Sequence, residues 1–497
     1  MAPRMSKHTL DFLFNCVSIV LIRLRGFFIP TLIVSYLGVK DFGAYTVALT
    51  MSQLLAAISS CGMSQAIVSY YPDYEKDNRL FSLLLQSLSP IVFVSLPISI
   101  IFFFLADKLS LLLLHSEEYT LLFKINSILL IVIAIYNIVV SFIRGRDEIK
   151  LYSSIETLLV WLEIPLGLLI LLFYRSLEAL VSMLIGVYVL VAGGIVIHLL
   201  QIMPWRRPGW TGWWRLYAFG LPLVPSRLSN EVSNRGDRLI VGYFLGAAAA
   251  GTYSFYYMLA NVISYLSLPF ISVMPSKLIR LWYSNEKDKI YQIIYLSLKW
   301  ILLLSLLLII FMDSMGGYIF KFIIKKEQLE FSRMTLLILM GGILLFSLGR
   351  LCNLIQLVNR RTGAMGLIWT ATALINIVAN FILVPIIGID GAAIATLLSY
   401  LVMCTISYKL ISNLLAGIIN LKIVGKLIFL FLVGLLLIFI DFSYVSQNLI
   451  LIFVIKLMLF CSAVLVVNPM HIDAEYKARD KIMGYFRKIA GAEYGSS

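Results

Sequence analysis

The stretch LYAFGLPLVPSRLSNEVSNRGDRLIVGYFLGAAAAGTY (residues 216–253) decides the fold of this chain. It is long enough to cross a bilayer as a helix and is apolar at both ends, but its middle is strongly polar. The polar residues there are Arg227, Asn230, Glu231, Asn234, Arg235, Asp237 and Arg238. At about 100° per residue, positions 227, 231, 234 and 238 fall on one face of the helix. Each charge at membrane depth costs roughly 2.5–3.5 kcal/mol on insertion scales, so such residues face a bundle interior or a wet cavity.

Three arginines and two carboxylates on the inner side of one helix predict a water-filled chamber for an anionic ligand. Arginine is the preferred partner of phosphate and carboxylate groups because its planar guanidinium binds them bidentately. The alternative is a buried ladder of ion pairs, Arg227–Glu231 and Glu231–Arg235, that only holds helices together.

The composition indicates an all-α polytopic membrane protein. The chain of 497 residues is 61% hydrophobic and 13% charged, whereas soluble domains are about 25% charged. Its mean hydropathy is +0.94. Apolar runs of about 20 residues recur between short polar breaks, as transmembrane helices require. Fourteen spans are predicted, at 9–34, 44–69, 81–105, 119–143, 151–173, 177–200, 216–243, 252–276, 290–311, 333–358, 364–387, 389–412, 423–440 and 446–467.

The distribution of lysine and arginine predicts that both termini are cytoplasmic. With the amino terminus inside, 24 of the 40 basic residues fall in inner loops and 7 in outer loops. The net charge of +14 then reflects topology and an anionic ligand, and we expect no nucleic-acid partner. Nine basic residues remain within spans: Arg23, Arg25, Lys124, Arg227, Arg235, Arg238, Lys299, Arg350 and Lys456. Of these, Lys124 and Lys456 are expected to extend toward the membrane surface or to contact lipid.

An internal repeat links the first and seventh spans. Leu37-Gly38, Gly43 and Tyr45 recur as Leu245-Gly246, Gly251 and Tyr253, always 208 positions later. We expect the first glycine to end a helix, the second to open a turn, and the tyrosine to anchor at the membrane interface. Six spans separate the copies, so the repeat predicts two pseudo-symmetric six-helix lobes plus a terminal helix pair. The expected units are an amino-terminal lobe (1–205), a cytoplasmic connector (206–215), a carboxy-terminal lobe (216–415), helices 13 and 14 (416–468) and a basic cytoplasmic tail (469–497).

Further polar residues inside spans extend the predicted site. Arg23 lies near mid-depth of span 1, with Arg25 about 200° round the helix from it, and the repeat makes Arg23 the counterpart of Glu231. With Lys299 and Arg350 in spans 9 and 10, these are candidates for a cationic cavity. Glu156 and Glu163 in span 5 could exchange H⁺ or bind Na⁺, or could pair with an arginine of the opposite lobe. The amides of Asn353, Gln356, Asn359, Asn376 and Asn380 could bind sugar hydroxyls or bridge helices.

No catalytic pattern is found in the sequence, and we expect neither an enzyme nor an organic cofactor. The four histidines are scattered, and no phosphate-binding loop is present. The five cysteines lie in apolar segments without metal-ligand spacing, which indicates buried thiols and no metal site. Loops are short, the longest being predicted at roughly 312–332.

Three motifs carry a family resemblance. The segment GLPLVPSRLSNEVSNRGDRLIVGYFLGAAAAGTYSFYYMLA (220–260) resembles the seventh-span signature of Wzx-type polysaccharide flippases of the MOP (MATE-like) exporter superfamily. LGVKDFGAYTVA (37–48) and IGIDGAA (387–393) are similar to two further signatures of that family. The resemblance covers essentially the whole chain, and the motifs say little about which glycan is recognised.

The resemblance implies translocation of an undecaprenyl-diphosphate-linked oligosaccharide, such as an O-antigen unit, from the cytoplasmic to the periplasmic face of a bacterial inner membrane. It also implies V-shaped halves that alternate access, and a cationic lumen for the diphosphate or acidic sugars. Membrane lipids and glycan polymerase or chain-length proteins are the implied partners. By family analogy the residues that face substrate are Arg23, Arg227, Arg235, Arg238 and Arg350.

Four alternatives stay open. A flippase for the peptidoglycan precursor lipid II would share fourteen spans and a cationic cavity. A MATE-type drug exporter would have twelve spans and an acidic, aromatic pocket. A membrane glycan polymerase or ligase would need a long outer loop with paired arginines or a histidine, and a scaffold for glycan assembly would not need so many buried charges.

Overall fold

The computed structural model describes residues 25–203, 209, 212–284, 286–324, 331–358, 362–414 and 449–467, and all regular elements in these ranges are helical. The first described helix covers 25–36. The others are α2 (Val39–Ser59), α3 (Met63–Lys76), α4 (Leu80–Pro90), η1 (Ile91–Ser95), α5 (Leu96–Phe104), α6 (Ala106–Leu114), α7 (Thr120–Gly145), α8 (Ile149–Phe173), α9 (Leu177–Ile202), α10 (Trp213–Gly220), η2 (Leu221–Leu223), α11 (Val224–Ala260), α12 (Val262–Tyr283), α13 (Lys287–Ile323), α14 (Arg333–Val358), α15 (Thr362–Ile387), α16 (Ile389–Leu414) and α18 (Leu449–Val467).

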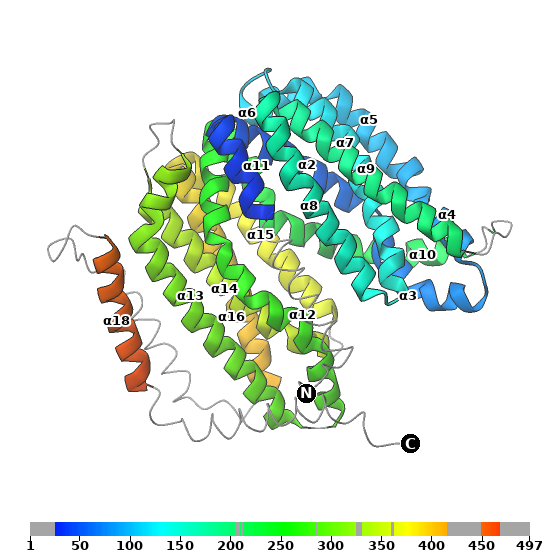
Figure 1. Cartoon of the computed structure of the whole chain (residues 1–497). Coiled ribbons are helices and arrows are strands. Elements are labelled where there is room, and N and C mark those ends of the chain that lie inside the picture. The colour runs from blue at the N-terminus through cyan, green and yellow to red at the C-terminus, as the bar shows by residue number, and fades with distance from the viewer. Residues whose placement is uncertain are drawn as a thin grey trace, which may run out of the picture.

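The helices form two groups. In the amino-terminal lobe, α7 packs against α2, α3, α5 and α9, and α8 packs against α9. In the carboxy-terminal lobe, α14 packs against α12, α13 and α16, and α15 packs against α16. The lobes meet where α11 lies along α2, at the top of Figure 1, and the helices diverge toward α3 and α12 below. This arrangement confirms an all-α membrane fold of two helical lobes, while the domain boundaries stay a prediction.

Ten of the described helical segments are long and apolar enough to cross a membrane. The predicted number of fourteen is not confirmed. The first span is described only from residue 25, span 13 lies outside the described residues, and the seventh and eighth spans count as one continuous run. That run begins with α10, which packs on α3 through an approach so close that a Cβ on Gly62 would lie 2.2 Å from the Gly220 carbonyl oxygen.

The repeat is visible in the backbone. Gly38 and Gly246 both adopt positive φ, 108° and 80°, and interrupt the helix as predicted. The second glycine of each copy does not open a turn, because both lie within helices that pack closely together. A Cβ on Gly43 would lie 1.8 Å from the Ala247 carbonyl oxygen, and one on Gly251 would lie 2.0 Å from that of Val39.

These contacts are reciprocal, since residues 39 and 43 are the counterparts of 247 and 251. The same symmetry brings Thr46 and its counterpart Ser254 together in a hydrogen bond of 3.0 Å. We call this contact between α2 and α11 the glycine seam. It has the self-complementary form of a two-fold interface, as a duplicated pair of lobes requires.

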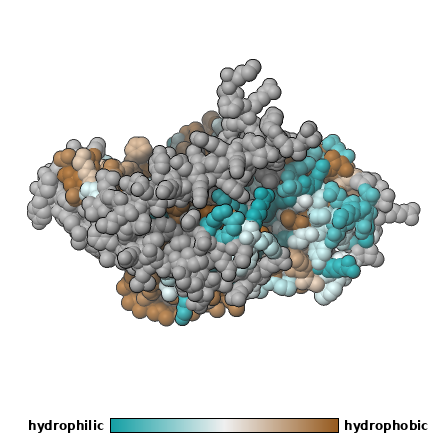
Figure 2. Space-filling model, turned by 90° about the horizontal axis from the view of Figure 1, so that it is seen from below, coloured by the Kyte–Doolittle hydropathy of each residue, from teal (hydrophilic) through white to brown (hydrophobic). Residues whose placement is uncertain are grey.

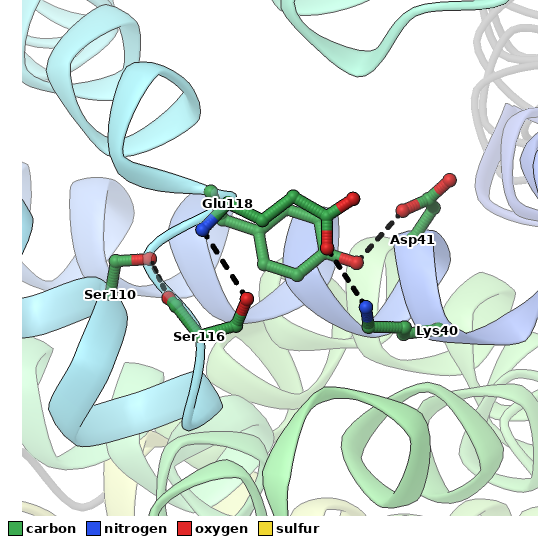
Figure 3. A network of polar contacts seen from close by, with 6 residues as sticks. Lys40, Asp41, Ser110, Ser116 and Glu118 are labelled. Carbon is green, nitrogen blue, oxygen red and sulfur yellow. Dashed lines mark hydrogen bonds and ion pairs between the residues drawn. The ribbon is translucent and has the colours of Figure 1, made fainter.

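A polar network lies beside the glycine seam, at the end predicted to be outside (Figure 3). Lys40 at the start of α2 pairs with Glu118 at 2.8 Å, and the Tyr119 hydroxyl donates to Asp41 at 2.9 Å. The turn between α6 and α7 also reaches the other lobe, because His115 Nε2 donates to the Tyr243 carbonyl of α11 at 2.8 Å. The outer end is therefore held together by packing and by hydrogen bonds.

Two predictions about the carboxy-terminal part are wrong. The expected long loop is largely helical, since α13 extends to Ile323 and packs its buried Phe320 against Tyr256. Lys456 does not extend to the membrane surface. Its side chain is 4% exposed and pairs with the buried Asp313 at 2.6 Å, which docks α18 on α13.

Candidate functional site

The polar face of α11 is accessible to solvent along its length. Six of its seven predicted residues are partly exposed: Arg227, Asn230, Glu231, Asn234, Arg235 and Arg238. Figure 2 shows the molecule from below Figure 1, with hydrophilic side chains in the centre and on the right of this view and apolar side chains mainly at its edges. The charged stretch is therefore neither sealed in a dry contact nor turned wholly into a helix bundle.

Of the two ion pairs that the alternative interpretation of this helix proposed, Glu231–Arg235 is present. Glu231 and Arg235 approach to 3.6 Å, with side chains 27% and 36% exposed. Arg227 instead donates to the Ser60 hydroxyl of the amino-terminal lobe at 3.5 Å. Arg238 lies over the ring of Tyr257, 5.0 Å from its centroid, and its Nε is buried without a hydrogen-bond partner. The arginines of this face thus keep donors available for a ligand.

Asp237 departs from the prediction that it faces the cavity. Its side chain is fully buried in the carboxy-terminal lobe, where it accepts hydrogen bonds from the Tyr253 hydroxyl and, at 3.4 Å, from Thr396. The backbone N–H of Arg238 also donates to it at 3.0 Å. Tyr253 is therefore no interfacial anchor, since it is fully buried and donates to this carboxylate.

A second polar cluster lies in the amino-terminal lobe around Arg25. Its guanidinium pairs with the fully buried Glu163 of α8 and lies 3.3 Å from the hydroxyl of Tyr188 on α9. The Arg25 side chain is 29% exposed, so this pair lies at the edge of the lobe. Glu163 was expected to couple an ion or to pair with an arginine of the opposite lobe; its partner belongs to its own lobe.

Glu156 lies seven residues, or about two helical turns, from Glu163 on the same side of α8. It accepts a hydrogen bond of 2.8 Å from the Tyr136 hydroxyl, and the Tyr136 ring packs edge-on against Tyr188 with centroids 5.1 Å apart. Both carboxylates of span 5 therefore belong to one polar cluster with two tyrosines. We call it the Arg25 cluster, comprising Arg25, Tyr136, Glu156, Glu163 and Tyr188.

The two buried sites occupy matching places in the two lobes. Tyr45 and Tyr253 are counterparts by the offset of 208. Helices α9 and α16 begin 212 positions apart, which matches Tyr188 with Tyr400. The duplicated architecture thus carries an arginine–glutamate pair in one lobe and a lone carboxylate hydrogen-bonded by hydroxyls in the other.

The remaining predicted residues lie farther from these clusters or outside the described range. Lys299 is 7% exposed and so contributes little to any open surface, and Arg350 lies over the ring of Phe346 at 5.3 Å. Arg23 and Asn359 lie outside the described residues. Asn376 donates to Ser399 at 3.4 Å and Asn353 accepts from Ser407 at 2.9 Å, so these amides bridge helices.

Sequence patterns did not reveal the hydroxyl-bearing side chains that contact the buried charges: Tyr136, Tyr188, Tyr253 and Thr396. The repeat contained the signal for one pair, because Tyr45 and Tyr253 recur at the offset of 208. The others come from helices whose offset has shifted to 212 or 213, which a single fixed offset does not detect. In the part of the chain that the structure describes, no cluster of three or more His, Cys, Asp or Glu side chains could hold a metal ion.

Two helical lobes with polar interiors, joined across a pseudo-two-fold seam, define a class of polytopic membrane proteins with duplicated halves. A family model described as "Polysaccharide biosynthesis protein" matches residues 10–276, which is more than half of the chain. The chain belongs to this family. No curated protein matches it significantly.

Solved structures with the same fold are transporters of the MOP superfamily. The lipid II flippase MurJ in an inward closed conformation is 16% identical, with a TM-score of 0.71 over 95% of this chain and 100% of that chain. An inward-facing multidrug resistance MATE transporter is 14% identical, with a TM-score of 0.61 over 84% and 96%. A MOP superfamily transporter from Pyrococcus furiosus, noted for the reversed polarity of its binding pocket, is 14% identical with a TM-score of 0.56 over 82% and 96%. The fold that the resemblance implied is thereby confirmed.

Proposed function

We propose that this protein moves an undecaprenyl-diphosphate-linked oligosaccharide unit from the cytoplasmic to the periplasmic face of a bacterial inner membrane, without chemical turnover. The observation that carries the proposal is the row of partly exposed arginines on α11, the helix that packs along α2 of the other lobe. Guanidinium groups in a restricted, partly desolvated space favour a diphosphate over cationic or neutral cargo. The family membership favours a glycan as the group that the lipid carries.

Transport would proceed by alternating access between the two lobes. The outer end is held by the glycine seam and its polar network, so the described conformation favours access from the inner side. Because no nucleotide-binding motif is present in the sequence, we propose that an ion gradient supplies the energy, through H⁺ or Na⁺. Membrane lipids and the enzymes that polymerise the exported unit are the proposed partners, and both termini are proposed to be cytoplasmic.

The experiment replaces each arginine of α11 by alanine and measures surface glycan in a host that lacks its own flippase. A hydrogen bond to a charged group contributes about 1.5–3 kcal/mol, so loss of one phosphate contact should reduce export by about tenfold or more. Arg227→Ala, Arg235→Ala and Arg238→Ala are the test variants. Lys108→Ala, which removes an exposed charge from α6 at the outer end, is the matched control and should export normally.

Normal glycan from all three variants, at wild-type protein levels, would contradict the proposed role of the arginines. A change in glycan chain length without a change in export, in a strain that lacks this protein, would favour a membrane enzyme instead.

A lipid II flippase is the second candidate, and the likeness to MurJ is the observation that favours it. The two candidates share the diphosphate carrier lipid and differ in the attached sugars. Rescue of cell-wall synthesis in a strain depleted of its lipid II flippase, without restored surface glycan in the glycan-flippase mutant, would favour this alternative.

A further inference from the structure

The Arg25–Glu163 pair combines features that a purely structural ion pair does not need. Glu163 is fully buried, and its second carboxylate oxygen, Oε1, has no hydrogen-bond partner. Arg25, by contrast, is 29% exposed and so remains accessible to an incoming group. An anchor between helices would be expected to satisfy both carboxylate oxygens, because an unsatisfied buried oxygen is costly. The Glu163 carboxylate thus lacks one of its hydrogen bonds, and the Arg25 guanidinium is partly exposed.

The charges around Arg25 increase its tendency to bind an anion. Arg235 on α11 of the opposite lobe is close enough to Arg25 for the two cations to repel each other. The Arg235 side chain is 36% exposed, and its own partner Glu231 is 3.6 Å away. Each lobe thus contributes one guanidinium group, and each group is compensated by a carboxylate of its own lobe. A diphosphate carries enough negative charge to pair with both.

From these observations we propose that Glu163 pairs with Arg25 while no substrate is bound. An arriving diphosphate displaces the carboxylate from Arg25. Glu163 then takes up one proton. The inference deepens the proposed function and rests on it, since it names the carboxylate that the substrate displaces; because that proton moves outward with the substrate, the proposed driving gradient is then that of Na⁺. The balance is simple: Arg25 stays cationic and exchanges one anionic partner for another. The released Glu163 carboxylate and one proton from solvent give a neutral carboxylic acid.

The proton uptake follows from burial. A buried carboxylate that loses its cationic partner is strongly destabilised as an anion and becomes neutral instead. The groups that face Glu163 do not replace Arg25: Tyr188 on α9 and Tyr45 on α2 are neutral, and Glu156 on α8 itself is a second carboxylate. Tyr136 on α7 already donates to Glu156. Arg25 on the first described helix is thus the counter-ion on which the Glu163 charge depends.

The sign of the pH dependence follows from linkage. If binding consumes one proton, the dissociation constant for the anion rises about tenfold for each unit of pH between the pH at which Glu163 titrates in the free protein and the higher pH at which it titrates in the complex. Removal of the acid should abolish this dependence and strengthen binding at high pH, because no competing carboxylate remains.

The test measures proton uptake by calorimetry of the purified full-length protein in buffers of different ionisation enthalpy. Inorganic diphosphate is the first probe and undecaprenyl diphosphate is the second. Wild type should take up about one proton more per bound diphosphate than Glu163→Gln, as one-site linkage requires, and comparison of the two variants removes the titration of diphosphate itself. Glu118→Gln, which neutralises an exposed carboxylate at the outer end, is the control and should behave as wild type.

Glu163→Asp guards against a folding defect in the first variant. It keeps an ionisable carboxylate opposite Arg25, so it should still take up the proton when diphosphate binds. Equal proton uptake by wild type and Glu163→Gln, or no binding of diphosphate to either, would overturn the exchange.

These outcomes are separable from the proposed function. Glycan export that requires this protein while Glu163→Gln shows unchanged proton uptake would refute the exchange and leave the flippase proposal standing. A difference in proton uptake with diphosphate alone, in a protein that exports no glycan, would support the exchange and refute the flippase proposal.

Discussion

At the scale of single residues, Tyr253 is one of the hydrogen-bond donors that stabilise the buried carboxylate of the carboxy-terminal lobe. Its hydroxyl donates to the fully buried Asp237, whose other donors are Thr396 and a backbone N–H. Tyr253→Phe removes one of three donors from a buried charge, so we expect a loss of about 1.5–3 kcal/mol in the free energy of unfolding. Thermal unfolding in detergent measures the effect. Tyr243→Phe on the same helix, whose side chain is exposed, should change it little.

An equal loss in Tyr253→Phe and Tyr243→Phe would mean that the Asp237 charge is held by other groups. The sequence identified Asp237 as a charge within a span, but it placed the side chain on the wrong side of the helix. Helical spacing predicts which residues share a face; it does not predict which of two neighbouring faces finds hydroxyl donors on other helices. Those donors, Tyr253 and Thr396, come from segments 16 and 159 positions away.

At the scale of helices, the glycine seam is where sequence and structure agree most closely. The repeat predicted paired helices, and the structure brings the matching residues of α2 and α11 into reciprocal contact. Gly43→Ala would place a methyl group against the backbone of Ala247, which cannot move aside as a side chain could. We expect a cost above the roughly 1–3 kcal/mol of ordinary overpacking and a clear loss of folded protein.

The yield of monodisperse protein after extraction measures this cost. Gly193→Ala in α9 is the matched control, because its Cβ would meet nothing within 4 Å, and it should be neutral or stabilising by about 0.5–1 kcal/mol. A Gly43→Ala variant that folds as well as Gly193→Ala would show that the seam is loose.

The docking of α18 provides a second prediction for helices. Lys456 pairs at 2.6 Å with Asp313, which also pairs with Arg333 at 2.5 Å. Lys456→Met removes one partner of a buried carboxylate and should cost about 3–5 kcal/mol, whereas Asp313→Asn combined with Lys456→Met should recover much of the loss. Thermal unfolding of the single and double variants measures the coupling. Additive losses in the double variant would contradict a direct pair.

The sequence misjudged this region because local composition and tertiary packing disagree there. Asp313 and the adjacent Gly316 and Gly317 resemble a loop, and a lone lysine in the last span resembles a residue near the membrane surface. In the structure, Phe331 fills the space beside Gly316, and the two charges neutralise each other. Tertiary contacts of this kind override helix propensity, and no spacing within either segment reports them.

At the scale of the whole molecule, the predicted two-lobe membrane fold agrees with the structure because hydrophobic periodicity and a repeat determine it. The sequence alone also identified the helix on which the candidate site is built. It could not provide the conformational state, because the contacts that close one end are distributed over both copies of the repeat.

If the lobes alternate access, the glycine seam has to open at its outer end during each cycle. Thr46 and Ser254 are the counterparts that meet there, with their hydroxyl oxygens 3.0 Å apart. Cysteines at both positions would need only a small shift to reach the disulfide bond length of about 2.05 Å. In a chain whose five native cysteines are replaced, Thr46→Cys with Ser254→Cys should therefore cross-link on mild oxidation and stop glycan export. Reductant should restore export, and each single cysteine variant should export normally under both conditions. Full export by a completely cross-linked protein would mean that the seam stays closed throughout transport and that the lobes do not separate at this end.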